Sequence, residues 1–270
     1  MKSYSHVISK LFNSPLLITP ARHAAICQLV ESRMENPAAM PMDERDTEME
    51  DEEIQQVGKT AVIPVHGTIV PHASDLAMSE CGCPLDGLNA MIDMAENDAS
   101  ISRVVYDFQT PGGTATGVPE TGRKILYSRK ETIAFTDSEC CSGGLWLAAQ
   151  CQRFYATPSS CIGSCGVYCM TLDLTKAMKK EGVKMNAIFA GKYKLLGASF
   201  KPLEDDERAI LQAGVDRIYA QFKDAMGSHR TVSDENFGNG LCFDGEQAAE
   251  LGFTDGCVDG LDEILEEMVD

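Results

Sequence analysis

The sequence predicts an α/β protein with a largely parallel sheet, and the alternation of strand-like and helical patterns is the main reason. Short apolar runs lie at Val104 to Phe108 and Ile133 to Phe135, and helical patterns cover Leu85 to Ala95, Gly117 to Tyr127 and Leu145 to Ala149. Such alternation is typical of βαβ units. The length of 270 residues and the hydrophobic content of 44% are sufficient for one large buried core.

Three regions are expected along the chain. Residues 1–35 form a helical segment, in which Pro20 occupies the first turn and a loose apolar stripe follows. Residues 36–58 form an acidic disordered linker, because Asp43 to Glu53 carries eight acidic residues against the single Arg45. Residues 59–270 form the main domain, which opens with a strand from Thr60 to Ile69.

The charge and the cysteines restrict the class of protein. A net charge of −18 argues against nucleic acid or an anionic membrane surface as the main partner. The apolar stretch at the N-terminus is broken by polar residues, and no later stretch approaches the length of a membrane span, so we expect no membrane anchor. The eleven cysteines are an odd number, which favours reduced thiols and a cytoplasmic location.

Three of these cysteines, Cys161, Cys165 and Cys169, recur every four residues. Zinc sites usually contain closely spaced cysteine pairs with matched partners, and this spacing meets that requirement only in part. The sequence therefore favours small buried residues over a metal site.

The stretch from Thr132 to Ala149 holds the main candidate for a nucleophile. A buried strand is followed by Ser142-Gly143-Gly144 and then by an apolar helical pattern. A serine at such a junction can face a cleft, and the glycines allow a substrate to approach the backbone. Taken alone, the motif is more often a flexible loop before a helix, so the catalytic interpretation requires a base and a second oxyanion donor.

Two other segments supply these groups. Thr110-Pro111-Gly112-Gly113 follows a strand and can expose backbone N–H groups, and Lys194 lies among small and apolar residues further along the chain. Lys192 is an alternative base. Cys141 is an alternative nucleophile, although no paired histidine accompanies it.

His66 is a further candidate base, but its place beside a glycine at the end of a strand favours a structural or surface role.

These motifs, in this order, resemble the S49 peptidase family, which includes the signal peptide peptidase A group and phage head-maturation proteases. Gly163-Ser164-Cys165-Gly166-Val167 and the closing segment from Gly245 to Asp255 also match the family pattern, so the resemblance runs from about Lys59 to Leu265. Thr110 replaces a serine and Cys165 replaces an isoleucine of that pattern. The resemblance implies a ClpP/crotonase-like fold, in which repeated ββα units wind into a spiral.

The resemblance also implies a serine endopeptidase with a Ser-Lys dyad. Ser142 is then the nucleophile, Lys194 the base, the backbone N–H groups of Gly113 and Gly143 the oxyanion donors, and Ser164 a supporting residue for the lysine. No metal or organic cofactor is implied. The implied substrates are phage capsid, scaffold or portal proteins, and the implied assembly is a homo-oligomer.

Three alternatives remain open at this stage. One is a soluble S49 peptidase that degrades signal peptides or other proteins. Another is a crotonase-like acyl-CoA enzyme that uses Asp137 or Glu139 as its acid or base. The last is a non-catalytic, capsid-associated scaffold protein.

Overall fold

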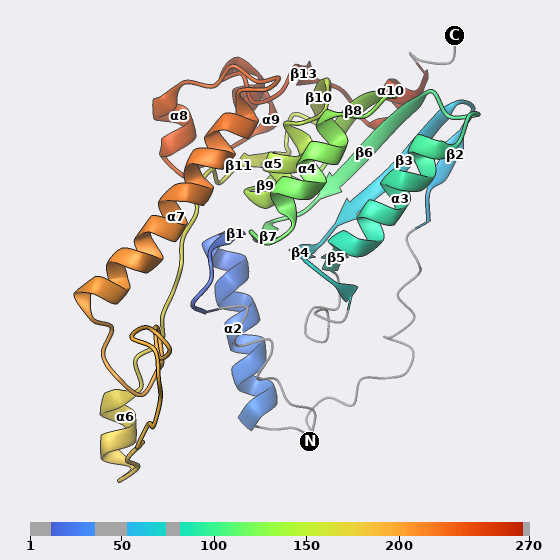
Figure 1. Cartoon of the computed structure of the whole chain (residues 1–270). Coiled ribbons are helices and arrows are strands. Elements are labelled where there is room, and N and C mark those ends of the chain that lie inside the picture. Colours follow the sequence, from blue (N-terminus) through green and yellow to red (C-terminus); the bar gives the residue numbers. More distant parts are fainter. Residues whose placement is uncertain (1–11, 36–52, 74–81, 267–270) are drawn as a thin grey trace.

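The computed structural model describes residues 12–35, 53–73 and 82–266 (Figure 1). Their largest element is a six-stranded sheet in the order β13-β10-β8-β6-β3-β2. Its strands are β2 (Gln55–Val57), β3 (Thr60–His66), β6 (Arg103–Gln109), β8 (Glu131–Thr136), β10 (Arg153–Ala156) and β13 (Gly256–Cys257). All neighbouring pairs are parallel except β2 with β3. The predicted α/β class with a largely parallel sheet is therefore confirmed.

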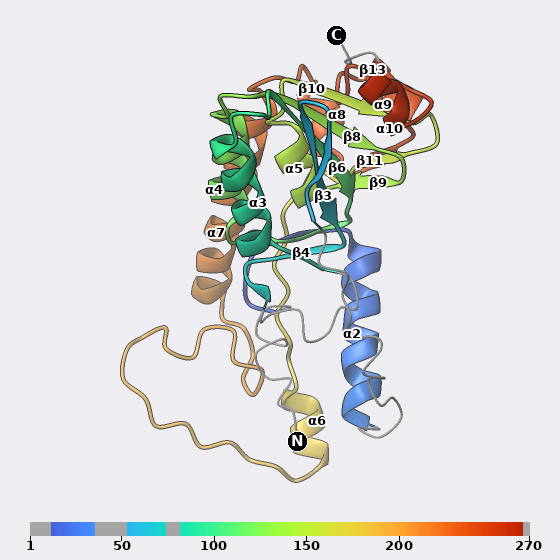
Figure 2. The same cartoon turned by 90° about the vertical axis from the view of Figure 1, so that its right-hand side faces the viewer.

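Helices cover both faces of this sheet, which explains why its central strands β3, β6 and β8 are mostly buried on both sides (Figure 2). Val104, Tyr106 and Phe108 of β6 belong to the main core, on the side of α3 (Leu85–Asn97), α4 (Val118–Leu126) and α5 (Gly143–Ala148). Val105 points the other way and packs in a second cluster with Ile264 of α10 (Leu261–Glu266).

A unit of two strands and a helix repeats along the chain. In each unit one strand joins the six-stranded sheet and the next joins a smaller sheet: β3 with β4 (Thr68–Val70), β6 with β7 (Gly112–Thr114), β8 with β9 (Glu139–Cys141), and β10 with β11 (Cys161–Gly163). Helices α3, α4 and α5 close the first three units, and β5 (Gly82–Pro84) comes before α3. The ββα repeat that the resemblance implied is therefore present.

The prediction of a single strand from Thr60 to Ile69 was wrong. Gly67 has a φ of +82°, a conformation that side chains rarely tolerate, and the chain turns there between β3 and β4. The two halves consequently lie in different sheets.

The N-terminal segment is joined to the main domain. Strand β1 (Leu16–Ile18) pairs antiparallel with β7, and its three side chains are buried. The predicted helix follows as α2 (Pro20–Glu35). The prediction of a disordered linker at residues 36–58 was wrong at its C-terminal end, because residues 55–57 form strand β2, which pairs with β3. The acidic tract at 36–52 lies outside the described residues.

A long helix, α7 (Asp205–Met226), connects the core to an extension of the chain. The ring of Phe222, in α7, stacks on the ring of Trp146 in α5, and the two ring centroids are 5.0 Å apart. Beyond its C-terminus the buried Arg230 binds the Asp255 carboxylate and donates to the Cys151 carbonyl at 2.8 Å. Helices α8 (Asp234–Gly238) and α9 (Gly245–Glu250) and strand β12 (Cys242–Phe243) complete this part.

Residues 169–204, here called the arm, run away from the sheets and return to the start of α7 (Figures 1 and 2). The arm contains the short helix α6 (Thr175–Lys180). Its backbone closes on itself where the Leu174 N–H donates to the Ser199 carbonyl at 2.7 Å. Most of its remaining residues are exposed, so it adds little to the core of its own chain.

Leu17→Ala is expected to destabilise the protein by about 2–5 kcal/mol, because Leu17 is fully buried in the main core. Leu241→Ala is the matched control, since Leu241 is 59% exposed and its truncation should cost less than about 1 kcal/mol. Denaturant unfolding of both variants measures the difference. Equal stability of the two variants would show that β1 is not part of the folded unit.

Candidate active site

Ser142 lies at the junction of β9 and α5, as the sequence predicted. Its φ of 52° and ψ of −112° are unusual for a residue with a side chain, and its exposed surface is only 1%. The Ser142 N–H donates to the Gly163 carbonyl at 2.9 Å, which helps to hold this conformation. A serine on a strained turn between strand and helix is the arrangement of a nucleophile elbow.

The two predicted oxyanion segments lie against each other. A Cβ on Gly112, whose φ is +90°, would lie 2.9 Å from the Gly143 nitrogen, and a Cβ on Gly143 would lie 3.6 Å from the Gly113 nitrogen. The backbones of Gly113 and Gly143 are therefore neighbours, although 30 positions of sequence separate them. Glycine at position 112 is required both by its φ and by the close approach.

The backbone carbonyl of Leu17 lies against both of these glycine segments. The oxygen of Leu17 would be 2.0 Å from a Cβ on Gly112 and is 3.2 Å from the position of a Cβ on Gly143. It belongs to β1, where Leu17 pairs with Gly113 of β7. Sequence reasoning missed this contact, and the run Leu16-Leu17-Ile18 was the one signal that could have indicated a strand.

Thr110 joins the two segments. Its hydroxyl donates to the Gly67 carbonyl at 2.5 Å and accepts from the Gly112 N–H at 3.1 Å. Its backbone N–H donates to the Glu139 carbonyl at 2.7 Å, and its carbonyl accepts from the Cys141 N–H at 3.0 Å. The threonine thus keeps the hydroxyl of the serine that it replaces in the family pattern and holds β6 beside β9.

Ser164 also lies near Ser142, whose N–H donates to the carbonyl of Gly163, the residue that precedes Ser164. Ser164 has a φ of 54° and donates its N–H to the Leu241 carbonyl at 2.7 Å. The structure therefore brings together the backbones of Ser142, Gly113, Gly143 and Ser164.

Lys194 is not brought to Ser142 within the same chain. It is exposed on the arm, where its N–H donates to the Gly191 carbonyl at 3.1 Å. Its neighbour Lys192 binds Asp206 in the first turn of α7 at 2.8 Å. Phe222, which stacks on Trp146 of α5, lies 16 residues after Asp206, or about 24 Å along the axis of α7. The dyad remains a prediction that needs another arrangement of the arm or another subunit.

The alternative base, Lys192, is less suited to the role. Its hydrogen bond to the Asp206 carboxylate raises the pKa of Lys192, and a lysine that keeps its proton cannot accept one from a serine. Lys194 therefore stays the better candidate of the two.

The alternative nucleophile, Cys141, is buried immediately before Ser142. Hydrogen bonding to Cys161 and Cys242, together with burial, raises the pKa of the Cys141 thiol. A thiol that stays protonated is a poor nucleophile.

His66 contacts the Asp107 carboxylate at 3.1 Å and so links β3 to β6. Asp107 is the partner that the sequence did not indicate. This contact supports the structural role that was expected for the histidine.

Similarity to known protein families identifies the family of this chain. The sequence profile of Peptidase family S49 matches residues 124–270, which is more than half of the chain and includes Ser142 and Lys194. This chain belongs to peptidase family S49. Among the described residues of this S49 protein, no helix is both long enough and apolar enough to cross a membrane.

Two phage proteins are similar to this S49 chain over nearly its whole length. The head-tail preconnector protein GP5 of Enterobacteria phage P21 is 27% identical over 97% of the chain, and the capsid assembly protease C of Escherichia phage lambda is 25% identical over 98%. The chain spans only 57% and 65% of the length of those two relatives. Among solved structures, a mutant of the 1510-N membrane-bound stomatin-specific protease aligns with a TM-score of 0.47 at 16% identity, covering 79% of this chain and 86% of that one.

Thr110→Val is expected to reduce kcat strongly, because the Gly67 carbonyl and the Gly112 N–H would lose their partner, at a cost of about 1–3 kcal/mol each. Thr110→Ser is the matched control, since it keeps the hydroxyl and should retain most of the activity. Peptide cleavage rates and melting temperatures of both variants measure the effect. Equal activity of the valine and serine variants would exclude a positioning role for this hydroxyl.

Proposed function

We propose that this chain is a serine endopeptidase in which Ser142 is the nucleophile. The main support is the strained backbone of Ser142, which lies beside the adjoining backbones of Gly113 and Gly143. The chain also belongs to peptidase family S49. Such a site offers an attacking hydroxyl and two N–H groups that can stabilise one oxyanion. Loss of a single oxyanion donor costs roughly 3–4 kcal/mol in comparable sites.

The chemistry follows from these groups. Ser142 Oγ attacks the scissile carbonyl, its proton passes to the neutral amine of Lys194, and the negative charge moves to the carbonyl oxygen. The lysine then returns the proton to the leaving amine, which leaves an acyl-enzyme. Water, deprotonated by the same amine, releases the acyl group and restores Ser142. Ser164 is proposed to orient Lys194.

The position of Leu17 supports an extended substrate. The carbonyl of β1 lies between Gly112 and Gly143 while β1 pairs antiparallel with β7. An extended peptide that paired with β7 in the same manner would present a carbonyl to the proposed oxyanion donors. In this structure β1 holds that place and β4 pairs with the other edge of β7, so a substrate that pairs with β7 requires β1 to move.

Ser142→Ala is expected to abolish peptide cleavage and to leave the melting temperature nearly unchanged, because the hydroxyl is the attacking group. Ser228→Ala is the control, since Ser228 is an exposed serine beyond the C-terminus of α7 and cleavage should persist. The products of a reporter peptide, separated by mass spectrometry, give the rates. Wild-type activity in the Ser142→Ala variant would refute the assignment.

We propose further that Lys194 reaches Ser142 of a neighbouring subunit in a homo-oligomer. The arm carries most of the exposed large hydrophobic side chains among the described residues: Met170, Leu172, Leu174, Val183, Met185, Ile188, Phe189 and Tyr193. Exposed apolar surface of this extent is typical of protein interfaces. Burial of the arm against a second subunit would also desolvate Lys194, and desolvation favours the neutral amine that a base must be.

A mixture of Ser142→Ala and Lys194→Ala proteins tests this arrangement. Each variant alone should be inactive. If the base crosses a head-to-tail interface, random mixing leaves roughly a quarter of the sites with both groups, and that fraction of activity should return. Lys194→Arg in place of Lys194→Ala should be equally inactive alone, because arginine keeps its proton at neutral pH. No recovery in a mixed oligomer of verified mass would refute the crossing.

Phage structural proteins are the proposed substrates. The names of the two similar phage proteins, a head-tail preconnector and a capsid assembly protease, support capsid, scaffold or portal proteins, in a cytoplasmic or prohead setting. General protein degradation is the second candidate. Incubation with structural proteins encoded beside the gene, followed by mass spectrometry, separates the two: defined cleavage sites support maturation, and cleavage of any unfolded chain supports degradation.

A further inference from the structure

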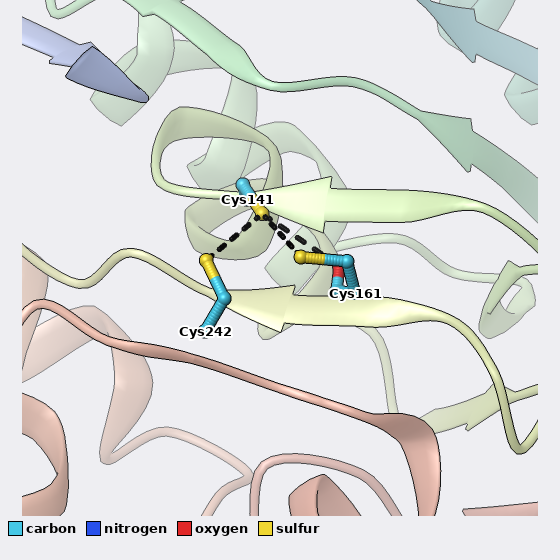
Figure 3. A group of neighbouring side chains, drawn as sticks. All are labelled: Cys141, Cys161 and Cys242. Atoms are coloured by element: carbon cyan, nitrogen blue, oxygen red, sulfur yellow. Dashed lines mark hydrogen bonds between the residues drawn. The ribbon is translucent and has the colours of Figure 1, made fainter. Parts of the chain in front are cut away.

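Three cysteine thiols converge in the small sheet that carries Ser142 (Figure 3). The Cys141 sulfur lies 3.7 Å from that of Cys242 and 3.9 Å from that of Cys161, and all three sulfurs lie within 4.8 Å of one another. They come from three different strands, β9, β11 and β12. The linear sequence does not indicate this group, because its members are 20 and 81 positions apart.

The strand register explains the convergence. Gly163 of β11 pairs with Cys141 of β9 on one side and with Cys242 of β12 on the other. Cys161 is two residues before Gly163 and so points to the same face of the sheet. Because Gly163 has no side chain, the two flanking thiols can lean over it and meet the Cys161 thiol.

A disulfide does not fit this arrangement. Strands are about 4.8 Å apart, so the Cα atoms of Cys141 and Cys242, which are separated by one intervening strand, lie about 10 Å apart. Cys161 lies diagonally from each of the other two, at about 8 Å. A disulfide requires a Cα separation below about 7 Å, so none of the three pairs can close without backbone movement.

A tetrahedral metal ion does fit. Zinc binds cysteine sulfur at about 2.3 Å, so two sulfurs in a tetrahedral shell lie about 3.8 Å apart. The observed separations of 3.7 and 3.9 Å match that value without rearrangement of the strands. Cys141 is buried, Cys161 is half-buried and Cys242 is exposed, so an ion held here would have its fourth position toward solvent.

An acidic side chain lies beside the thiols. Glu139 pairs with Cys161 in the strand register and is two residues before Cys141, so its carboxyl group lies on the same face of the sheet.

We propose that Cys141, Cys161 and Cys242 bind one Zn²⁺ ion, with water or another small ligand in the fourth position. Binding releases the thiol protons to solvent and leaves three thiolates on the metal. The ion would tie β9, β11 and β12 together at the residue before Ser142 and around Gly163, whose carbonyl accepts the Ser142 N–H. The proposal does not depend on the peptidase function, because it concerns the sheet and not the reaction.

The test uses the full-length, reduced, metal-free protein. Zn²⁺ is titrated against a chromophoric chelator, and Cd²⁺ is titrated separately to record the thiolate-to-metal absorption band. Wild type is expected to bind one ion per chain and to melt at a higher temperature with Zn²⁺. Cys161→Ser and Cys242→Ser should each weaken Zn²⁺ binding by at least roughly 100-fold, since loss of an outer-shell partner alone costs 10–100-fold. Neither of these two variants should show a higher melting temperature with Zn²⁺ than without it.

Cys257→Ser is the matched control, because Cys257 is also exposed but lies on β13 in the other sheet. It should bind Zn²⁺ like the wild type. The metal-free melting temperature shows whether each variant folds, and the exposed Cys242 makes Cys242→Ser the decisive variant if Cys161→Ser does not fold. Wild-type Zn²⁺ affinity in Cys242→Ser, or an equal loss in Cys257→Ser, would overturn the proposal.

Discussion

The close approach of two backbone segments, Gly112–Gly113 and Ser142–Gly143, is the constraint on which the candidate site depends. No side chain fits between them, since a Cβ on Gly112 would meet the Leu17 oxygen and the Gly143 nitrogen. Thr110 fixes the approach through hydrogen bonds to both neighbouring turns. The ββα repeat supplies the two segments, because each unit ends its main strand on the same side of the parallel sheet, where ligand sites of such folds gather. The positive φ of Ser142 is then maintained by the surrounding backbone rather than by local preference.

Helix α5, which directly follows Ser142, is held by a second set of contacts. Trp146 stacks on Phe222, and Phe222 meets Phe237 edge to face, so α5, α7 and α8 form one aromatic cluster. Arg230 and Asp255 close the same region, and Asp255 also accepts from the Phe154 N–H at 2.7 Å. These contacts give α7 a fixed direction relative to Ser142. As a consequence the arm, which joins α7 at its far end, holds Lys194 away from the site of its own chain.

Gly163 has two roles that belong to one geometry. Its carbonyl accepts the Ser142 N–H, and its missing side chain leaves room for the thiols of Cys141, Cys161 and Cys242. The candidate nucleophile therefore directly follows β9, one of the three strands that carry the proposed metal site. A ligand that stiffens this sheet would act on the backbone that positions Ser142, which offers a physical route from metal availability to the state of the site.

The sequence by itself determined the α/β class, the alternation of the main strands with helices, and the local chemistry of the glycine motifs. These properties depend on hydrophobic periodicity and on residues whose backbone preferences act over a few positions, as at Gly112 and Gly143. Only the tertiary structure decided which strands pair and which side chains from distant segments are in contact. The turn at Gly67 divides one apolar run between two sheets. Strand β1 pairs with β7, which lies nearly a hundred positions later in the sequence. Three cysteines from strands that are distant in the sequence meet over Gly163. Such contacts follow from strand register and sheet order, which a linear pattern of apolar and polar residues does not specify.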